Sequence, residues 1–344
     1  MSSYAEKERI AWIDWAKALL IYFVVVGHAG CKDNVQIILY AFHMPAFFVI
    51  SGYLYRPRQC LKTIKCLVVP IIIYSTINLV FKFALDMTRQ GCIDLFHYAT
   101  MSWRAFYAVA WGKDGYVTLF VGVWFVVVLA LCRCLMGDVK NFKFISQHYI
   151  ELALLMMLWM VCEKYIFPTN SSDIQDMYLY RVLSCFPFMA LGKFIKEEEL
   201  QLVGFMNYKF PPPPPKKLHG TLSIILILIL GIIVALDNGL VYVWSNDYGD
   251  NTFVFFAGAI ILSFSLFKAC NYLKANMFIK TISSGTLMIL GVHSITIVVF
   301  HNALELCYIA NTFIEPWIVG LLTMLVCYYP IRWLSLKFPI LLGK

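Results

Sequence analysis

The chain has 344 residues, of which 61% are hydrophobic and 14% charged, and its formal net charge is +8. Soluble proteins carry ~25% charged residues, so these totals exclude an ordinary soluble domain and indicate an integral membrane protein. A basic chain can bind nucleic acid, but here the lysines and arginines concentrate in alternate loops, which is a membrane-topology signal and argues against a nucleic-acid partner.

A membrane-spanning helix needs ~20 mostly apolar residues. By this criterion the sequence predicts an all-α integral membrane protein with about ten transmembrane helices, forming a single polytopic domain over residues 1–344. The predicted spans are residues 10–30, 35–55, 66–85, 116–135, 149–167, 178–195, 219–236, 252–270, 282–303 and 316–337.

The loop charges set the orientation. If the N-terminus is cytoplasmic, the inner segments hold 20 lysines and arginines, and the outer segments with their edges hold 6. Cytoplasmic loops carry an excess of these residues. An even number of spans then predicts that both termini are cytoplasmic.

The first two spans carry ionisable residues that a simple anchor would not keep: Asp14, Lys17, His28 and His43. A charge at the bilayer centre costs at least ~2.5 kcal/mol on insertion scales, so each is a candidate functional residue. Lys17 and His28 share nearly one helix face and stand ~16 Å apart along its axis. The short outer loop predicts that His28 and His43 face one cavity. The structural alternative is an Asp14–Lys17 ion pair with an interfacial His28.

Further candidates lie beyond these two spans. Arg56 and Arg58 follow the second span on the predicted inner side, where they would meet phosphates or simply fix the topology. His293 lies near the middle of the ninth predicted span. His301 lies nearer the outer end of that span, where a hydrogen-bonded packing role is expected.

The eleven cysteines contain no CxxC pair, and most lie in apolar runs. They are expected to be small buried hydrophobes that form neither a disulfide framework nor a metal site.

Two loops are long. The outer loop, roughly 86–115, contains Trp103, Tyr107 and Trp111, which are expected to form an interfacial belt or to stack on sugar rings. The inner loop, 196–218, is expected to be a cytoplasmic linker between the sixth and seventh spans. Its run from Pro211 to Pro215 predicts a stiff polyproline II spacer.

No nucleophile elbow, HExxH, P-loop or dinucleotide-binding loop is present, so a covalent enzyme intermediate has no support in the sequence. A direct transfer between two bound substrates needs less machinery. It requires one histidine as general base and an electropositive site for an anionic donor.

Several segments together resemble one family. The first span has the pattern ID-x2-K-x9-GH at 13–28, and the second has FHMPAFFVISGYL at 42–54. Weaker elements follow in the same order: Trp124-Phe125, then FPFMALG at 186–192, then a late helix with Gly285-Thr286 and His293-Ser294. This series resembles acyltransferase family 3, and within it the fucose 4-O-acetylase-like branch.

The resemblance implies a bacterial plasma (inner) membrane enzyme that moves an acyl group, usually acetyl from acetyl-CoA, onto a hydroxyl of an extracytoplasmic carbohydrate. No tightly bound cofactor and no metal are implied. His28, aided by His43, would be the general base. Lys17 and Asp14, with Arg56 and Arg58, would bind the donor, and Ser51, Trp124 and His293 would line the acceptor side or the pocket.

One residue departs from the family pattern: the basic residue of the first span is often arginine, and here it is Lys17. Lysine keeps the charge but loses the bidentate geometry of arginine.

Two other functions stay open. The same polar stripe suits a transporter that exports a glycan or a metabolite, because buried Asp, Lys and His residues also mark transport paths. No internal repeat is apparent, which disfavours an inverted-repeat transporter. A scaffold that recruits a partner through Pro211–Pro215 ranks last, since it gives no reason for His28 and His43.

Overall fold

The computed structural model describes residues 9–90, 96, 98–100, 102–104, 122–137, 144, 147–166, 178–206 and 217–344. Within these ranges the regular elements are helices, and one isolated antiparallel bridge joins Tyr242 to Asp247. The α-helices are α1 (Ala11–His28), α2 (Asp33–Tyr53), α3 (Cys60–Gln90), α5 (Val123–Gly137), α7 (Tyr149–Ile166), α9 (Tyr178–Met206), α10 (Lys217–Asn238), α11 (Thr252–Cys270), α12 (Met277–Ser284), α13 (Thr286–Leu306) and α14 (Glu315–Lys337). Two short 3₁₀ helices are η2 (Val243–Ser245) and η3 (Pro339–Leu342).

Seven of the described helices are long and apolar enough to cross a membrane: α1, α2, α3, α10, α11, α13 and α14. The prediction of an all-α integral membrane protein is therefore confirmed. Each predicted span overlaps at least one helix. The full number of ten spans and the cytoplasmic position of both termini stay predictions, because α5, α7 and α9 do not meet the same criteria in the described part of the chain.

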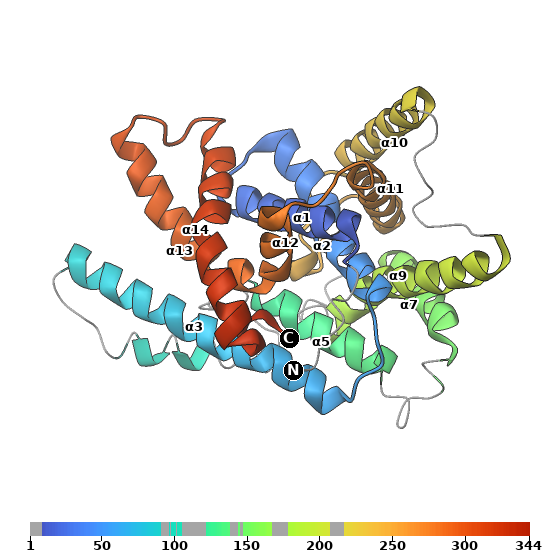
Figure 1. The fold of residues 1–344 in the computed structure, drawn as a ribbon, viewed down its shortest axis with the longest axis horizontal. Helices are drawn as coiled ribbons and strands as arrows, with labels where there is room; N and C mark the ends of the chain where they lie inside the picture. The colour runs from blue at the N-terminus through green and yellow to red at the C-terminus, as the bar shows by residue number, and fades with distance from the viewer. Residues whose placement is uncertain are drawn as a thin grey trace, which may run out of the picture.

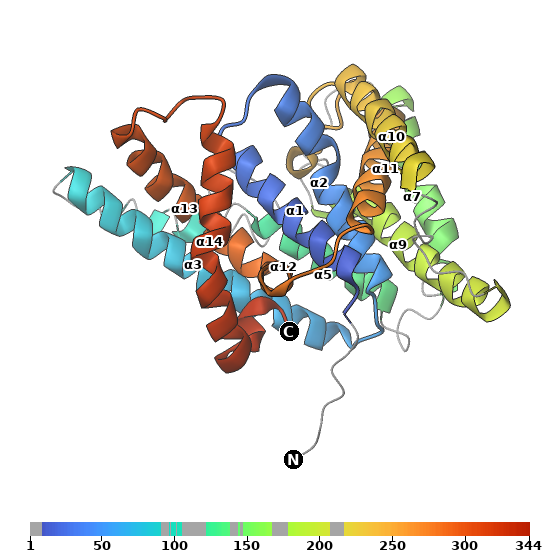
Figure 2. The same ribbon diagram turned by 45° about the horizontal axis from the view of Figure 1, so that its top comes forward.

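Helix α1 occupies the centre of the molecule. It packs against α2, α11, α12, α13 and α14. In both orientations of the ribbon, α3, α13 and α14 lie on one side of the α1–α2 pair, and α7, α9, α10 and α11 lie on the other (Figures 1 and 2). A central α1 explains why Asp14 is buried and why Lys17 is partly buried inside the protein, away from lipid.

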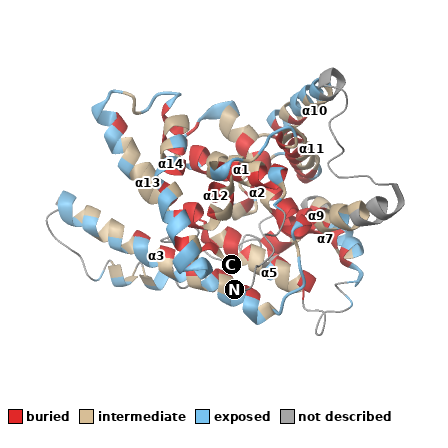
Figure 3. Cartoon of the chain, viewed as in Figure 1, coloured by how far each residue is buried: buried red, intermediate tan, exposed pale blue. Residues whose placement is uncertain are grey.

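The outer helices present apolar side chains outward. On α10, Leu226, Leu230 and Ile233 are all exposed, and the burial pattern shows pale exposed positions along this helix (Figure 3). A soluble protein rarely exposes so large an apolar surface. Hydrocarbon of the bilayer is the solvent that such a surface fits.

Helices α2 and α9 approach most closely through two glycines. A Cβ atom added to Gly52 would lie 1.9 Å from the carbonyl oxygen of Met189, and one added to Gly192 would lie 1.9 Å from that of Val49. Small residues allow membrane helices to bring their backbones together in this way. The contact fixes α2, and with it Ser51, against α9.

We expect Gly52→Ala to destabilise the protein by about 1–3 kcal/mol, because the new methyl group meets backbone that cannot rotate away. Thermal unfolding of the purified protein in detergent measures the loss. Gly258→Ala is the matched control, since its nearest contact is a side-chain atom of Val234 at 3.2 Å. Equal unfolding temperatures for Gly52→Ala and the wild type would show that the two helices are not held by this contact.

The cysteine prediction is wrong at one pair. Cys60 at the start of α3 and Cys134 near the end of α5 form a disulfide, with their Cα atoms 5.0 Å apart. The two residues are 74 positions apart in sequence, and only the packing of α3 against α5 brings them together. Five of the other cysteines (Cys31, Cys132, Cys185, Cys270 and Cys327) are free and buried, as expected of small hydrophobes.

Three boundary predictions need correction. The ninth predicted span, 282–303, is broken into α12 and α13 at Gly285, whose backbone (φ −108°, ψ 14°) leaves the helical region. Helix α3 continues to Gln90, into the predicted outer loop. Helix α9 continues to Met206, so the first half of the predicted linker is helical, and Pro211–Pro215 lie outside the described residues.

The acidic run on α9 is tied to its neighbours. Glu199 accepts hydrogen bonds from the Tyr53 hydroxyl at 2.5 Å and from the Lys196 amine at 3.1 Å, and Glu197 accepts one from the Tyr149 hydroxyl. These contacts hold the extended end of α9 to α2 and α7.

Candidate active site

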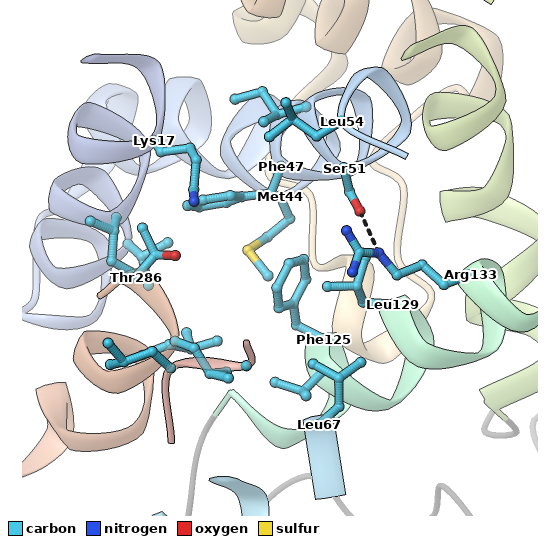
Figure 4. Close-up of a pocket in the computed structure, with 18 residues that line it drawn as sticks. Lys17, Met44, Phe47, Ser51, Leu54, Leu67, Phe125, Leu129, Arg133 and Thr286 are labelled. Carbon is cyan, nitrogen blue, oxygen red and sulfur yellow. Dashed lines mark hydrogen bonds between the residues drawn. The ribbon is translucent and has the colours of Figure 1, made fainter. Parts of the chain in front are cut away.

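A cavity of about 170 Å³, here called the apolar cavity, lies between α1, α2, α3, α5, α13 and the C-terminal turn (Figure 4). Its apolar lining includes Val24, Met44, Phe47, Phe125 and Leu290. Its polar side chains are Lys17, Ser51, Arg133 and Thr286. Lys17 and Arg133 reach it from opposite sides, with Met44 and Phe125 between them (Figure 4).

A second cavity of about 300 Å³, here called the basic cavity, adjoins the first. The two share the lining residues Leu54, Arg133 and Gly343. The remaining lining residues are Tyr55, Arg56, Arg58, Thr63 and Lys344. Four cations and no carboxylate side chain are therefore among the lining residues of this cavity.

Lys17 extends into the apolar cavity because Asp14 is engaged elsewhere. The Asp14 carboxylate binds the Arg9 guanidinium through two contacts, at 2.6 and 3.1 Å, and Arg9 also donates to the Lys280 carbonyl at 2.9 Å. The alternative of an Asp14–Lys17 ion pair does not occur. Asp14 thus anchors the start of α1 to α12, and among the described residues the Lys17 amine has no hydrogen-bond partner.

Arg133 is the cation common to both cavities. Its Nε donates to the Ser51 hydroxyl at 3.1 Å, which fixes the guanidinium between α5 and α2 (Figure 4). Arg133 is one of the 20 inner lysines and arginines that predicted the orientation of the chain, and it was not among the predicted site residues. The available signal was its place within the apolar helix VWFVVVLALCRCLMG, where a charged residue is a candidate functional residue.

Three histidines gather where α1, α2 and α13 meet. The ring centroids of His28 and His293 are 5.0 Å apart, and the Tyr40 ring lies 6.2 Å from His28 and 5.2 Å from His43. The Tyr40 ring thus neighbours both His28 and His43, but neither histidine is among the lining residues of the two cavities, so their predicted position facing one cavity stays a prediction. His43 and His293 are 4% and 1% exposed, whereas His28, the last residue of α1, is exposed.

Backbone contacts fix the tautomers of the two buried histidines. The Nδ1 of His43 lies 2.5 Å from the Leu39 carbonyl, and the Nδ1 of His293 lies 2.7 Å from the Leu290 carbonyl. A carbonyl only accepts, so each Nδ1 carries the proton and each neutral ring presents a lone pair at Nε2. The His293 Nε2 is buried without a partner among the described residues. An unpaired buried acceptor is a candidate contact for a ligand or a proton.

Helix register joins the cavities to the histidines. Val24, Phe47 and Leu290 line the apolar cavity, and each lies one turn from His28, His43 and His293 respectively. One turn is ~5.4 Å along the axis. The basic cavity therefore adjoins one part of the apolar cavity, and the three imidazoles lie about one helical turn from residues that line the apolar cavity.

Aromatic side chains continue past the histidines. The Tyr242 ring lies 5.6 Å from Tyr40 and 6.1 Å from Trp244. Asn238 holds this loop: its amide donates to the Tyr248 carbonyl and its oxygen accepts from the Asn251 amide, each at 2.9 Å. The sequence predicted sugar-stacking aromatics in the loop at 86–115. In that loop Trp103 is 66% exposed, and Tyr107 and Trp111 lie outside the described residues.

Two remaining candidates lie apart from the cavities. The first is Trp124, which does not line the apolar cavity, although its neighbour Phe125 does. The Nδ1 of His301 contacts the buried Glu315 carboxylate at 2.5 Å, so this histidine joins α13 to α14, as expected of a packing residue.

Comparison with known proteins gives one match. A family model described as an acyltransferase domain matches residues 10–332. The match contains both arginines after α2, the three histidines and Arg133, and it ends before Lys344. No curated protein and no solved structure matches the chain.

Proposed function

The chain belongs to acyltransferase family 3, and from this premise we propose that it moves an acetyl group from cytoplasmic acetyl-CoA to a hydroxyl of an extracytoplasmic carbohydrate. The membrane would be the bacterial plasma membrane. Acetyl-CoA enters as a substrate, and no tightly bound cofactor is proposed.

The observation that carries the proposal is the order of the basic cavity, the apolar cavity and the three histidines. The basic cavity suits the phosphates of coenzyme A, because cations are the partners of phosphate groups. The apolar cavity beside it suits the extended pantetheine arm. The ~16 Å between Lys17 and His28 along the axis gives that arm room to bring its thioester to the imidazoles.

His28 is the proposed general base. Of the three clustered histidines it alone has an exposed side chain, so a bulky acceptor can reach it. His43 and His293 are neutral rings that hold their Nδ1 protons on backbone carbonyls. Their lone pairs supply acceptors beside the imidazolium that forms on His28.

The step balances without a further reactant. His28 takes the proton of the acceptor hydroxyl as its oxygen attacks the thioester carbonyl carbon. The carbon–sulfur bond then breaks, and the departing sulfur receives the proton from the imidazolium. The products are an O-acetyl ester and free coenzyme A. No enzyme-bound acyl group is needed, which agrees with the absence of a nucleophile motif.

The acceptor proposal rests on the aromatic side chains beyond His28. The Tyr40 ring lies 6.2 Å from the His28 ring, and the Tyr242 ring lies 5.6 Å from that of Tyr40, so Tyr40 connects Tyr242 to His28. Sugar rings carry apolar C–H faces that pack on aromatic rings while their hydroxyls remain solvated. A carbohydrate seated on Tyr242 would therefore place a hydroxyl near His28.

We expect Tyr242→Ala to raise the KM for the acceptor about threefold to tenfold, because one aromatic contact is lost, and to leave the KM for acetyl-CoA unchanged. Steady-state kinetics with each substrate varied in turn measures both. Tyr308→Ala is the matched control, since Tyr308 is 95% exposed in the α13–α14 loop. A donor effect larger than the acceptor effect would contradict the assignment.

The proposed function is tested with the purified protein, acetyl-CoA that carries an isotopic label in its acetyl group, and a panel of carbohydrates. Label that appears in a carbohydrate ester, with an equal amount of free coenzyme A, supports it. Movement of a carbohydrate across a vesicle membrane with no acetylation would instead favour the transporter alternative.

A further inference from the structure

The last residues of the chain form part of both cavities. After α14 ends at Lys337, the 3₁₀ helix η3 (Pro339–Leu342) turns back across the bundle and packs against α3, α13 and α14. The C-terminal end lies beside α3 and α5 (Figure 1). We call residues 339–344 the C-terminal strap. The family match ends at residue 332, so the strap lies outside it.

Specific contacts seat the strap. The Tyr74 hydroxyl donates to the Leu341 carbonyl at 2.8 Å, and Leu342 is 6% exposed. Gly343 has a positive φ of 73°, a conformation that glycine adopts without strain. A Cβ atom at Gly343 would also lie 3.1 Å from the Leu287 side chain. The turn at Gly343 directs the chain from the apolar cavity, which Leu342 lines, to the basic cavity, which Lys344 lines.

Lys344 joins cations that lack a counter-ion. Arg56, Arg58 and Arg133 line the same cavity, and no acidic side chain is among its lining residues. Partial burial, and to a smaller extent the nearby positive charge of Arg9, lowers the pKa of the Lys344 amine. The Arg9 charge is itself offset by Asp14, whereas no salt bridge joins Arg56, Arg58, Arg133 or Lys344 to another described residue. Even when the α-carboxylate of Lys344, the last residue of the printed sequence, is counted, the four basic side chains leave an excess of positive charge, which attracts an anion.

We propose that the C-terminal strap is a wall of the donor site and that Lys344 binds a phosphate of the donor. This inference rests on the proposed function, because the ligand is the phosphate-bearing end of coenzyme A. Lys344 supplies a donor contact that the matched family region does not contain. Leu342, two residues earlier, lines the apolar cavity along which the pantetheine arm would lie.

The test is titration calorimetry of the purified full-length protein in detergent, with coenzyme A as the probe. Lys344→Ala is expected to raise the Kd about threefold to tenfold, the loss of one charge-assisted contact. Lys344→Glu is expected to raise it about tenfold, since attraction becomes repulsion. Lys337→Glu is the matched control: it changes the same charge on an exposed residue at the end of α14, away from both cavities, and should leave the Kd unchanged.

The outcomes separate the strap from the proposed function. A wild-type Kd for Lys344→Glu, with weakened binding for Arg133→Ala, would overturn the role of the strap and leave the donor site intact. Failure of the wild-type protein to bind coenzyme A would overturn the proposed function and the role of the strap with it. Equal weakening by Lys344→Glu and Lys337→Glu would show only a general charge effect and would also overturn the role of Lys344.

Discussion

Replacement of His28 by alanine is expected to lower the rate of acyl transfer about 10²–10⁴-fold, the usual contribution of a positioned general base. His28 is an exposed residue at the end of α1, so a solvated substrate can reach it and its loss should leave the helix bundle folded. The ring that remains nearest, His293, is buried and lies 5.0 Å away between centroids. Release of coenzyme A from acetyl-CoA in the presence of acceptor measures the rate.

His148→Ala is the control for this prediction. His148 is also an exposed histidine, but it lies at the start of α7, where it pairs with Glu151 at 3.5 Å. Its loss should leave the rate unchanged. Binding of coenzyme A should be the same for His28→Ala and the wild type, because the cations are untouched. A His28→Ala protein that transfers acetyl at the wild-type rate would remove His28 from the chemistry.

Arg133→Ala is expected to raise the KM for acetyl-CoA about 10- to 100-fold, the range for a lost hydrogen bond to a charged partner. Arg133 lines both cavities, so in the proposed donor site it would contact the junction between the phosphates of coenzyme A and its pantetheine arm. The value of kcat at saturating donor should change much less, because the guanidinium is remote from the histidines. Kinetics with acetyl-CoA as the varied substrate separates the two parameters.

Two variants sharpen this second prediction. Arg133→Lys should fall between alanine and the wild type, since lysine keeps the charge but not the planar geometry. Ser51→Ala removes the acceptor of the 3.1 Å hydrogen bond from Arg133 and should raise the KM by a smaller factor. An unchanged KM for Arg133→Ala would show that the donor does not use this cavity.

The first two helices were predictable from sequence because their ionisable residues interrupt long apolar runs. The sequence spacing of Lys17 and His28 predicted their ~16 Å separation along α1. Arg56 and Arg58 were already candidates for phosphate contacts. His293 was a candidate from its place in the ninth span. Its distance to His28 was not predictable, because it depends on how α13 packs against α1.

Other parts depend on three-dimensional packing alone. Asp14 lies one helical turn before Lys17, so the sequence allows these two residues to pair. The structure shows that Asp14 pairs with Arg9, because the chain just before α1 brings Arg9 beside it. Cys60 and Cys134 meet because α3 packs on α5. Tyr242 approaches Tyr40 because Asn238 folds its loop back over the bundle. Arg9 and Asp14 are only five residues apart, but their pairing competes with that of Asp14 and Lys17. The Cys60–Cys134 and Tyr40–Tyr242 pairs have no short-range sequence signal.

In the proposed mechanism, the donor enters the basic cavity from one side of the membrane, and its acyl group reaches an acceptor at His28 on the other side through the apolar cavity. Proteoliposomes test it most directly, with acetyl-labelled CoA outside and a carbohydrate acceptor enclosed in the lumen. Protein molecules whose basic cavity faces outward should deposit labelled ester in the lumen. His28→Ala should abolish most of it at any donor concentration, and Arg133→Ala should do so only when acetyl-CoA is far below the raised KM of that variant. Ester that forms only when donor and acceptor share one compartment would contradict transfer along this passage.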